Sequence, residues 1–317
     1  MKRKYLILVL LLLSMVSLLI GAKEIKIHRL LALGDEEVQL LLISRLPRLI
    51  SIIVAGMGMS IAGLIMQQIS RNKFVSPTTA ATVDSAKLGI LISMILFSRL
   101  SVVGRMLISF AFAMGASLLF MELLRRIKFK NIIFVPLLGL MLGNIIDSIA
   151  SFFAYRFDLV QNINIWLQGD FSMIIKGRYE LLYISIPLLG LALVYANKFT
   201  IAGMGEDFSI NLGLNYKQTV NIGLGIVALI SSLVIITVGR IPFLGLIIPN
   251  IVTIFQGDNM KKSIGHTALF GAIFLLFTDI LGRLIIYPYE IPISLTVGVI
   301  GSGIFLYLLV RGDRHGK

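Results

Sequence analysis

The chain has 317 residues, of which 57% are hydrophobic and 14% charged, and its mean hydropathy is +0.94. Soluble domains carry about 25% charged residues, so this composition excludes an ordinary soluble protein and indicates a membrane protein. The net charge of +13 could suggest a nucleic-acid partner, but the basic residues stand at the ends of apolar segments, where membrane topology accounts for them. The lack of cysteine excludes disulfides, thiolate metal sites and cysteine nucleophiles. His28, His266 and His315 share no ligand spacing, so we expect no metal site held by the protein.

About ten apolar segments follow one another along the chain, each near the ~20 residues that a membrane-spanning helix needs. In chain order they are residues 1–21, 45–69, a third segment ending near 97, 105–124, 134–154, 181–196, 220–238, a bent piece within 239–256, 267–286 and 293–310. The alternation places more Lys and Arg on the side that holds both termini. We therefore predict an all-α polytopic membrane protein, one transmembrane domain over residues 1–317, with about ten spans and both termini cytoplasmic.

The first segment has two interpretations. Lys2, Arg3 and Lys4 followed by a long apolar run also describe a signal peptide. No A-x-A-like cleavage site follows, and the run is long enough to span. We interpret it as the first helix, which starts in the cytoplasm.

Local signals predict details of the connections. Residues 35–37 are acidic and predict a short helix before the second span, which we expect to begin at Arg45 because Pro47 suits a first helical position. Trp166 lies in a long external loop, residues 155–180.

The longest polar insert in the second half of the chain is residues 197–217. Its pattern predicts two short amphipathic helices broken at Gly213. Three apolar residues recur at four-residue spacing on one face and three polar residues lie on others: Met204, Phe208 and Leu212, then Glu206, Asp207 and Asn211. A plain connector needs only about four residues, so the apolar stripe indicates a docking surface for a partner outside the membrane. The alternative is a helix that lies on the lipid surface.

Three acidic residues lie inside expected spans, where charge is costly and usually faces protein or water. Asp279 and Arg283 are four residues apart, and Asp84 and Lys87 three, so each pair is expected to meet on one helix face. A proton relay would need a chain of such groups, so we favour local charge neutralisation. Asp147 has no obvious partner in the sequence.

Catalytic patterns are missing from the sequence. It contains no G-x-x-x-x-G-K-[ST] phosphate loop, no H-E-x-x-H and no G-x-S-x-G. We therefore expect no enzyme activity, catalytic residue, cofactor or metal in this chain. If ATP drives it, another chain must bind the nucleotide.

Several motifs together resemble the permeases of iron-siderophore and cobalamin ABC importers, the FecCD-like family. They are Arg45-Leu46-Pro47-Arg48, Gln67 followed by Arg71-Asn72 and Pro77, Gly245-Leu246-Ile247-Ile248-Pro249, Asp279-Ile280-Leu281-Gly282-Arg283, and Glu290-Ile291-Pro292 followed by Gly301 and Phe305-Leu306-Tyr307-Leu308-Leu309. The likeness covers essentially the whole chain in matching order and spacing. The sequence looks most like the Gram-positive branch that handles catecholate siderophores such as petrobactin.

This resemblance implies an assembly in the plasma membrane of a Gram-positive bacterium. Two permease subunits would surround a central path, either two copies of this chain or, as is favoured, two different chains. Two cytoplasmic ATPases that hydrolyse ATP and an external lipid-anchored siderophore-binding protein would complete the assembly. The resemblance places the ATPase contact within residues 197–218, at Met204, Gly205, Glu206, Asp207, Phe208, Leu212, Gly213 and Leu214. It places docking of the binding protein on Arg45, Arg48 and Arg283. For the first two arginines the alternative is anchoring at a helix end by snorkelling.

The sequence also departs from the family. Relatives usually have Gly, His, Gly and Pro where Pro242, Asn250, Ser294 and Gly303 stand, and Asn-Pro where Asn72-Lys73 occurs. These changes are expected to reshape the external mouth and the last span. Cobalamin or haem is therefore an alternative cargo. An ion-coupled secondary transporter, with repeated broken helices and unpaired buried charges, and a membrane enzyme are the alternative classes.

Overall fold

The computed structural model describes residues 2–21, 35–79, 81–126, 134–175, 177 and 179–313. These residues are helical apart from connections and one isolated bridge between Gln168 and Arg240. The longer helices are α1 (Arg3–Leu19), α3 (Leu46–Ser70), α4 (Thr82–Leu96), α5 (Val102–Arg126), α6 (Phe134–Arg156), α8 (Ser185–Ala202), α10 (Tyr216–Val238), α11 (Leu244–Gln256), α12 (Met260–Leu284) and α13 (Ile293–Asp313). The short ones are α2 (Asp35–Leu40), α7 (Val160–Leu167) and α9 (Glu206–Asn211). The predicted all-α class is confirmed for these ranges.

Six helical segments in the described ranges are long and apolar enough to cross a membrane. They are Val38–Ser70, Val102–Phe120, Leu137–Arg156, Glu180–Ala202, Tyr216–Val238 and Met260–Leu284. The segments Leu244–Gln256 and Ile293–Leu308 are apolar but shorter. The chain is therefore a helical membrane protein, whereas ten spans stay a prediction.

The second span does not begin where Pro47 suggested. The short helix expected near residues 35–37 is present as α2, but it continues through a π-helical turn, η2 (Leu41–Arg45), directly into α3. In that turn the Leu46 N–H donates to the carbonyl of Leu41, five residues earlier. A wider turn relieves the clash between a proline ring and the preceding turn of the helix. Pro47 therefore lies inside one continuous helix instead of starting one.

The central element of the fold is α3, whose apolar window is 83% buried, against 22% for α6 and for α8. It packs against α8, α10, α11 and α12. Small residues allow this close approach: a Cβ on Gly56 would lie 2.8 Å from the Cα of Ala272 on α12, and one on Gly63 would overlap the backbone of Gly245 on α11. The core thus forms around a helix that has partners on every side.

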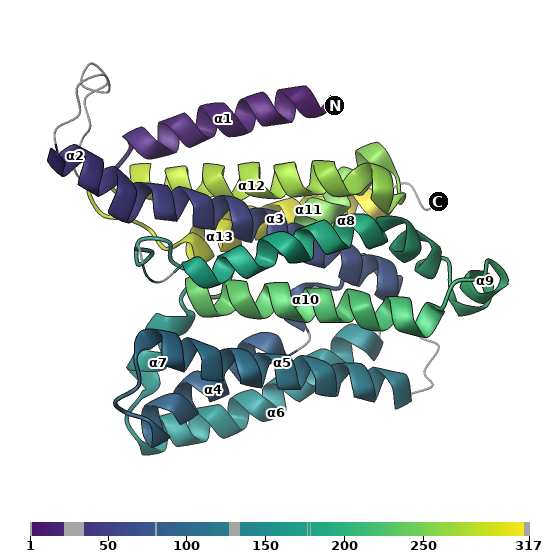
Figure 1. The fold of residues 1–317 in the computed structure, drawn as a ribbon, viewed down its shortest axis with the longest axis horizontal. Coiled ribbons are helices and arrows are strands. Elements are labelled where there is room, and N and C mark those ends of the chain that lie inside the picture. The colour runs from purple at the N-terminus through teal and green to yellow at the C-terminus, as the bar shows by residue number, and fades with distance from the viewer. Residues whose placement is uncertain are drawn as a thin grey trace.

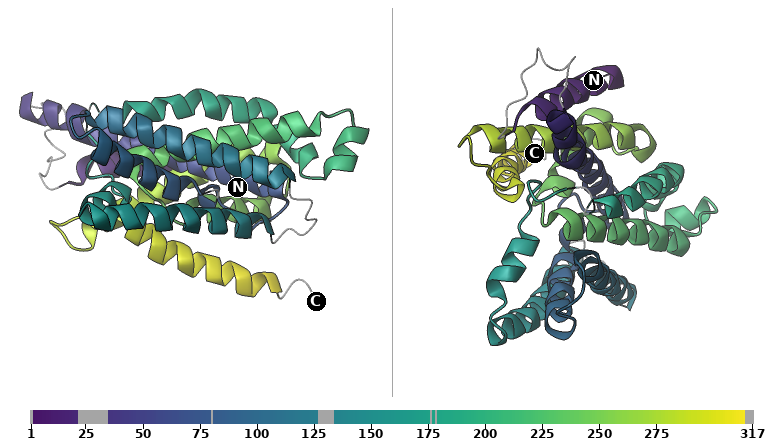
Figure 2. Two further views of the ribbon diagram at one scale, coloured as in Figure 1. Left: turned by 90° about the horizontal axis from the view of Figure 1, so that it is seen from below. Right: turned by 60° about the vertical axis from the view of Figure 1, so that its left-hand side comes forward.

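A second group of helices, α4 to α7, stands apart from the α3 group and is joined to it through α10. The right-hand view of Figure 2 shows this separate lobe. Helix α10 packs against α3 and α8 on one side and against α4 and α5 on the other. A displacement of α10 would therefore be transmitted to both groups of helices.

The two ends of the bundle carry different connections (Figure 1). The start of α1, the end of α13 and α9 lie at one end, and α2 and α7 lie at the other. We call these the α9 end and the α7 end. At the α9 end, the Met260 N–H that starts α12 donates to Thr200 Oγ1 on α8 at 3.1 Å.

Candidate functional sites at the two ends of the bundle

Residues 197–217 contain a single short helix, α9, between the end of α8 and the start of α10. The prediction of two short helices was therefore wrong. Residues 197–202 continue α8, and residues 216–217 belong to the first turn of α10. The Asn215 side chain accepts a hydrogen bond from Gln218 N at 3.1 Å and so caps α10. The apolar periods of α8 and α10 run farther than the polar composition suggested, which leaves only α9 between them.

Two glycines define the ends of α9. Gly205 precedes it with φ of 116°, and Gly213 follows it with φ of 76°, both conformations that favour glycine. Gly213 N donates to the Ile210 carbonyl and Leu214 N to the Ser209 carbonyl, each at 2.9 Å, the pair of bonds that forms a Schellman motif. The predicted break at Gly213 is confirmed.

A buried hydroxyl fixes α9 to α8. Ser209 Oγ lies 3.0 Å from the Ile201 carbonyl oxygen and 2.6 Å from that of Gly205. Ser209 is the buried residue of α9, so the other side chains of this helix point outward.

The outward face of α9 is apolar at its centre and acidic at its start. Met204, Phe208 and Leu212 are 54%, 49% and 58% exposed, and Glu206 and Asp207 are exposed as well. Large apolar side chains exposed together mark an interaction surface. We call Met204, Glu206, Asp207, Phe208, Ile210 and Leu212 the α9 surface. Ile210, 57% exposed, was missed because it lies off the four-residue stripe.

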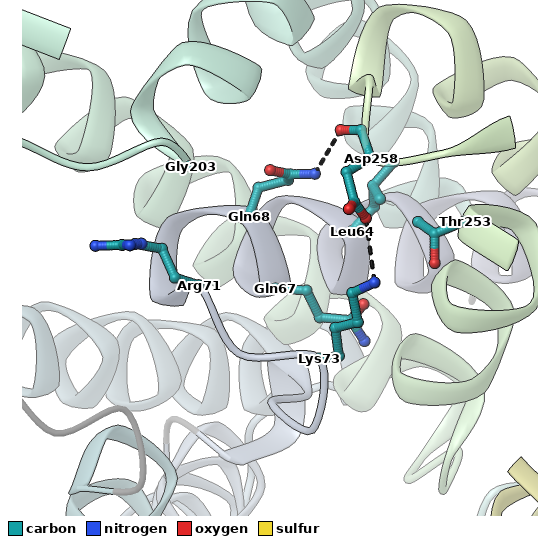
Figure 3. A pocket seen from close by; sticks show the side chains of 8 residues that line it. All are labelled: Leu64, Gln67, Gln68, Arg71, Lys73, Gly203, Thr253 and Asp258. Carbon is teal, nitrogen blue, oxygen red and sulfur yellow. Dashed lines mark hydrogen bonds and ion pairs between the residues drawn. The ribbon is translucent and has the colours of Figure 1, made fainter. Parts of the chain in front are cut away.

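A polar cavity of about 270 Å³ lies where α3 ends, close to Gly203 in the segment before α9 (Figure 3). It is lined by Leu64, Gln67, Gln68, Arg71, Lys73, Gly203, Thr253 and Asp258. Gln68 Nε2 donates to the Asp258 carbonyl at 2.9 Å, and Lys73 Nζ lies 3.3 Å from Asp258 Oδ1. A Cβ on Gly203 would collide with Gln68 Oε1. The end of α3 is thus in direct contact with the segment that leads into α9.

Asn250, one of the departures from the family, has a defined role in this region. Its side-chain amide donates to the carbonyls of Lys73 and Leu246, each at 2.8 Å, and Gln67 Nε2 donates to the same Leu246 carbonyl at 3.1 Å. These bonds tie the connection after α3 to α11. Periodicity gives no signal for such contacts, because the partners are more than 170 residues apart.

At the α7 end, the acid predicted to pair with one arginine pairs with two. Asp279 lies 2.6 Å from Arg283, which confirms the predicted pair, and also 2.8 Å from Arg48 on α3. Arg48 reaches a second carboxylate, Glu290, at 2.6 Å. The side chains of Asp279 and Arg283 are 2% and 4% exposed, and that of Arg48 13%. A buried charge of this kind is tolerated because it is paired.

Two arginines also close the end of α1. Arg283 Nη1 donates to the carbonyls of Ser17 and Ile20 at 3.0 and 2.9 Å, and Arg45 Nη1 donates to those of Leu18 and Leu19, the latter at 3.1 Å. The last carbonyls of a helix have no partner within it and carry the negative end of its dipole, so guanidinium groups are well suited to them. No sequence pattern predicted this cap.

The three arginines predicted to dock the binding protein therefore all have partners inside the chain. Arg45 and Arg283 are buried, 8% and 5% exposed, and Arg48 is held between two acids. Their docking role stays a prediction. If it holds, Arg48 and the partly exposed Glu290 are the members of the cluster nearest to solvent.

The other charges within these helices pair differently from the sequence expectation, and they are less buried: the side chains of Lys87 and Asp147 are 16% and 44% exposed. Lys87 Nζ lies 2.7 Å from Asp147 Oδ1 on α6, so its ion pair is with Asp147 rather than with Asp84. Asp147, which had no partner in the sequence, has one in the fold. Asp84 instead lies against Gly143 of α6, where a Cβ would collide with its carboxylate.

In the part of the chain that the structure describes, no group of three or more His, Cys, Asp or Glu side chains could hold a metal ion. Of the three histidines, His28 and His315 lie outside the described residues.

Comparisons with known proteins agree along the whole chain. Residues 8–311 match the family model described as the FecCD transport family. The petrobactin import system permease protein YclN of Bacillus subtilis is 63% identical over 311 residues, 98% of this chain and 98% of that protein. The ferric-anguibactin transport system permease protein FatD of Vibrio anguillarum is 38% identical over 298 residues, 94% of this chain and 95% of that protein. A solved metal-chelate type ABC transporter in an inward-facing conformation has a TM-score of 0.86 at 22% identity and covers 98% of this chain and 100% of that chain, which shows a shared fold.

Proposed function

Because the chain belongs to the FecCD transport family, we propose that it is the permease subunit of an ABC importer that moves a ferric siderophore of the catecholate type across the cell membrane. The observation that carries this proposal is the 63% identity, over 98% of both chains, to a protein named as a petrobactin import permease. The cell is of the Gram-positive type, as that relative's is.

The subunit works with partners. A second permease chain, different from this one, completes the path, two ATPase subunits hydrolyse ATP, and an external lipoprotein delivers the cargo. The chain itself is not an enzyme and carries no cofactor. A siderophore wraps the iron in its own oxygen atoms, so a chain without cysteine needs no metal ligands of its own.

In the membrane, the α9 end faces the cytoplasm and the α7 end faces outward. The ten longer helices then span the membrane, and both termini are cytoplasmic. The basic start of the chain, Lys2 to Lys4, and Lys261 and Lys262 at the start of α12 support this orientation, since Lys and Arg favour the cytoplasmic side.

The α9 surface is the ATPase contact. Its exposed apolar centre and acidic start offer a partner both buried area and charge. Gly205 and Gly213 at its two ends allow it to tilt, while the Ser209 hydroxyl holds it to α8. A push on α9 reaches α8 and α10, and α10 contacts both groups of helices. Closure of the ATPases thereby opens the path on alternate sides of the membrane.

The arginine cluster at the α7 end receives the binding protein. Arg48 is the member with a route to solvent, since its partner Glu290 is 27% exposed, and an acidic side chain of the binding protein can approach it there. Arg45 and Arg283 support the cluster by holding the end of α1.

Reconstitution tests the proposal. The complete assembly, with this chain, its partner permease, the two ATPases and the binding lipoprotein, is placed in vesicles containing ATP, and uptake of radioactive iron as ferric petrobactin is measured. We expect ATP-dependent accumulation that stops when this chain is omitted. Accumulation without ATP would support a secondary transporter instead, and uptake of cobalamin or haem in place of iron would overturn the cargo.

A further inference from the structure

Two hydrogen bonds hold the ammonium group of Lys87 in place. Lys87 Nζ donates to Asp147 Oδ1 at 2.7 Å and to Ser151 Oγ at 2.8 Å. An ammonium group has three N–H donors, so one of them has no partner among the described residues. The Lys87 side chain is 16% exposed and that of Asp147 44%, so the pair holds a cation in otherwise apolar helices, and ionisable groups in membrane segments commonly mark functional sites.

The ammonium lies on the wall of a cavity at the α7 end. The cavity has a volume of about 210 Å³ and lies between α4, α6 and α7. Its lining consists of Lys87, Ser151, Ala154, Tyr155, Val160, Ile163 and Asn164. Asp147 is absent from this lining, so the cavity meets the cation of the pair but not its anion. Its other polar groups are a hydroxyl, a phenol and an amide, which are all able to donate hydrogen bonds.

The size of the cavity limits what it can hold. Sites for drug-sized ligands have volumes of about 300–1,000 Å³, so a cavity of about 210 Å³ takes one functional group instead of a whole ferric siderophore. Tyr155, which lines it, is 76% exposed, so the lining reaches the surface of the chain. A wall with an ammonium group and three further donors fits an anionic oxygen.

We propose that this α4–α6–α7 cavity binds an anionic oxygen of the ferric siderophore, from a carboxylate or a catecholate group, as the cargo enters from outside, and that Lys87 donates its remaining N–H to that oxygen. Asp147 and Ser151 are positioning residues that hold the ammonium at the wall. This inference rests on the proposed function for the identity of the cargo, but the charge of the cavity can be measured without transport.

Because the chain has no cysteine, one introduced thiol is the single thiol of this subunit, and labelling is followed on this subunit after it has been separated from its partners. Asn164→Cys, in the reconstituted assembly, is labelled with an anionic and a cationic methanethiosulfonate reagent of similar size. The ratio of the two rates is divided by the same ratio at Met173→Cys, an exposed position near α7. We expect the anionic reagent to be favoured by roughly tenfold, the low end of what charged clefts achieve, and Lys87→Met to abolish the preference while Lys87→Arg keeps it.

Three controls separate the cavity from other causes. Lys87→Met combined with Asp147→Asn removes the carboxylate that Lys87→Met alone would leave without its partner, and it should also lose the preference. Arg99→Met, which removes an exposed cation in the connection after α4, should keep it. Ferric petrobactin should slow labelling of Asn164→Cys, and the same concentration of inorganic phosphate should not.

A labelling ratio that Lys87→Met leaves unchanged would overturn this inference, as would equal protection by phosphate and by ferric petrobactin. Neither result touches the proposed function, which fails only if the unmodified assembly does not import ferric siderophore. In the uptake assay, Lys87→Met should lower the rate several-fold while Lys87→Arg retains most of it.

Discussion

Replacing Asp279 by asparagine tests whether the charge cluster at the α7 end holds α1, α3 and α12 together. The side chain keeps its shape but loses its charge, which leaves Arg48 and Arg283 with Glu290 as their remaining acid. Removing one partner of a buried ion pair costs about 3–5 kcal/mol. We expect the lower end, about 3 kcal/mol, because Arg48 is 13% exposed and keeps Glu290.

For a chain of 317 residues, an unfolding entropy of about 2.1 cal/mol/K per residue makes about 1 kcal/mol correspond to roughly 1.5 °C in Tm, so Asp279→Asn should lower Tm by about 4–5 °C. The measurement is the loss of the monodisperse size-exclusion peak after heating in detergent. Glu122→Gln is the matched control, because Glu122 pairs with Arg126 on the exposed face of α5, side chains 38% and 76% exposed. Its effect should stay below about 1 kcal/mol.

The double variant Asp279→Asn with Arg283→Gln isolates the electrostatic cause. It removes the guanidinium that Asp279→Asn leaves without an ion pair, whereas Arg48 keeps Glu290, so part of the lost Tm should return. Equal Tm values for Asp279→Asn and Glu122→Gln would refute the account of the cluster as a charge-paired junction. No recovery in the double variant would show that the loss comes from packing.

Three further predictions concern transport. Glu206→Lys and Gly213→Pro should each abolish iron uptake, while membrane insertion, measured by immunoblotting, stays normal. Lysine at position 206 reverses a charge of the α9 surface, and proline at position 213 cannot adopt the φ of 76° found there. Unchanged uptake would remove α9 from the coupling role. Gly203→Val should collide with Gln68 and separate ATP hydrolysis from transport, with partial rescue by Gln68→Ala; a fully coupled Gly203→Val variant would contradict the contact between α3 and the α9 segment. Arg48→Glu should weaken capture of the binding protein in a pull-down assay, whereas undiminished capture would leave Arg48 as a structural residue.

The helices could be predicted from the sequence because the signal is local. Apolar runs of spanning length gave the positions of α5, α6 and α10 to within a few residues. Helix α12 begins about two turns before the predicted start. The break at Gly213 followed from the conformational freedom of glycine. The stripe of Met204, Phe208 and Leu212 was also readable, since residues four apart share one face of a helix and all three side chains are exposed in the fold.

The wrong predictions of helix boundaries arose where a local sequence preference was overridden by neighbouring structure. Pro47 suits a helix start, but a π-helical turn lets the helix run through it. Residues 197–202 read as part of a polar insert, yet the Thr200 hydroxyl bonds to the Ala196 carbonyl and the Met260 N–H, so a polar side chain is satisfied inside a long helix. Composition alone does not distinguish these outcomes.

Partners distant in the chain could not be predicted at all. Lys87 has an acid three residues away and pairs with one 60 residues away, because the packing of α4 on α6 decides which carboxylate is within reach. The cap on α1 needs Arg45 and Arg283, which are 26 and 263 residues from carbonyls that they bind. A single sequence contains no register between helices, and such contacts depend on that register.

The distribution of these contacts is consistent with a bundle whose α7 end is rigid and whose α9 end can move. At the α7 end, Arg45, Arg48 and Arg283 join α1, α3 and α12 through bonds that are costly to break, because each would leave a buried charge or helix end without a partner. At the α9 end, glycines flank a short helix whose side chains face outward, and segments with little burial are those that move at low free-energy cost. A force applied at α9 would therefore be expected to tilt α10 and the α4–α7 lobe against the α1–α3–α12 junction. The Lys87 cavity is lined from α4, α6 and α7 and so belongs to this lobe, which means that the proposed contact with the cargo is expected to change if the lobe tilts.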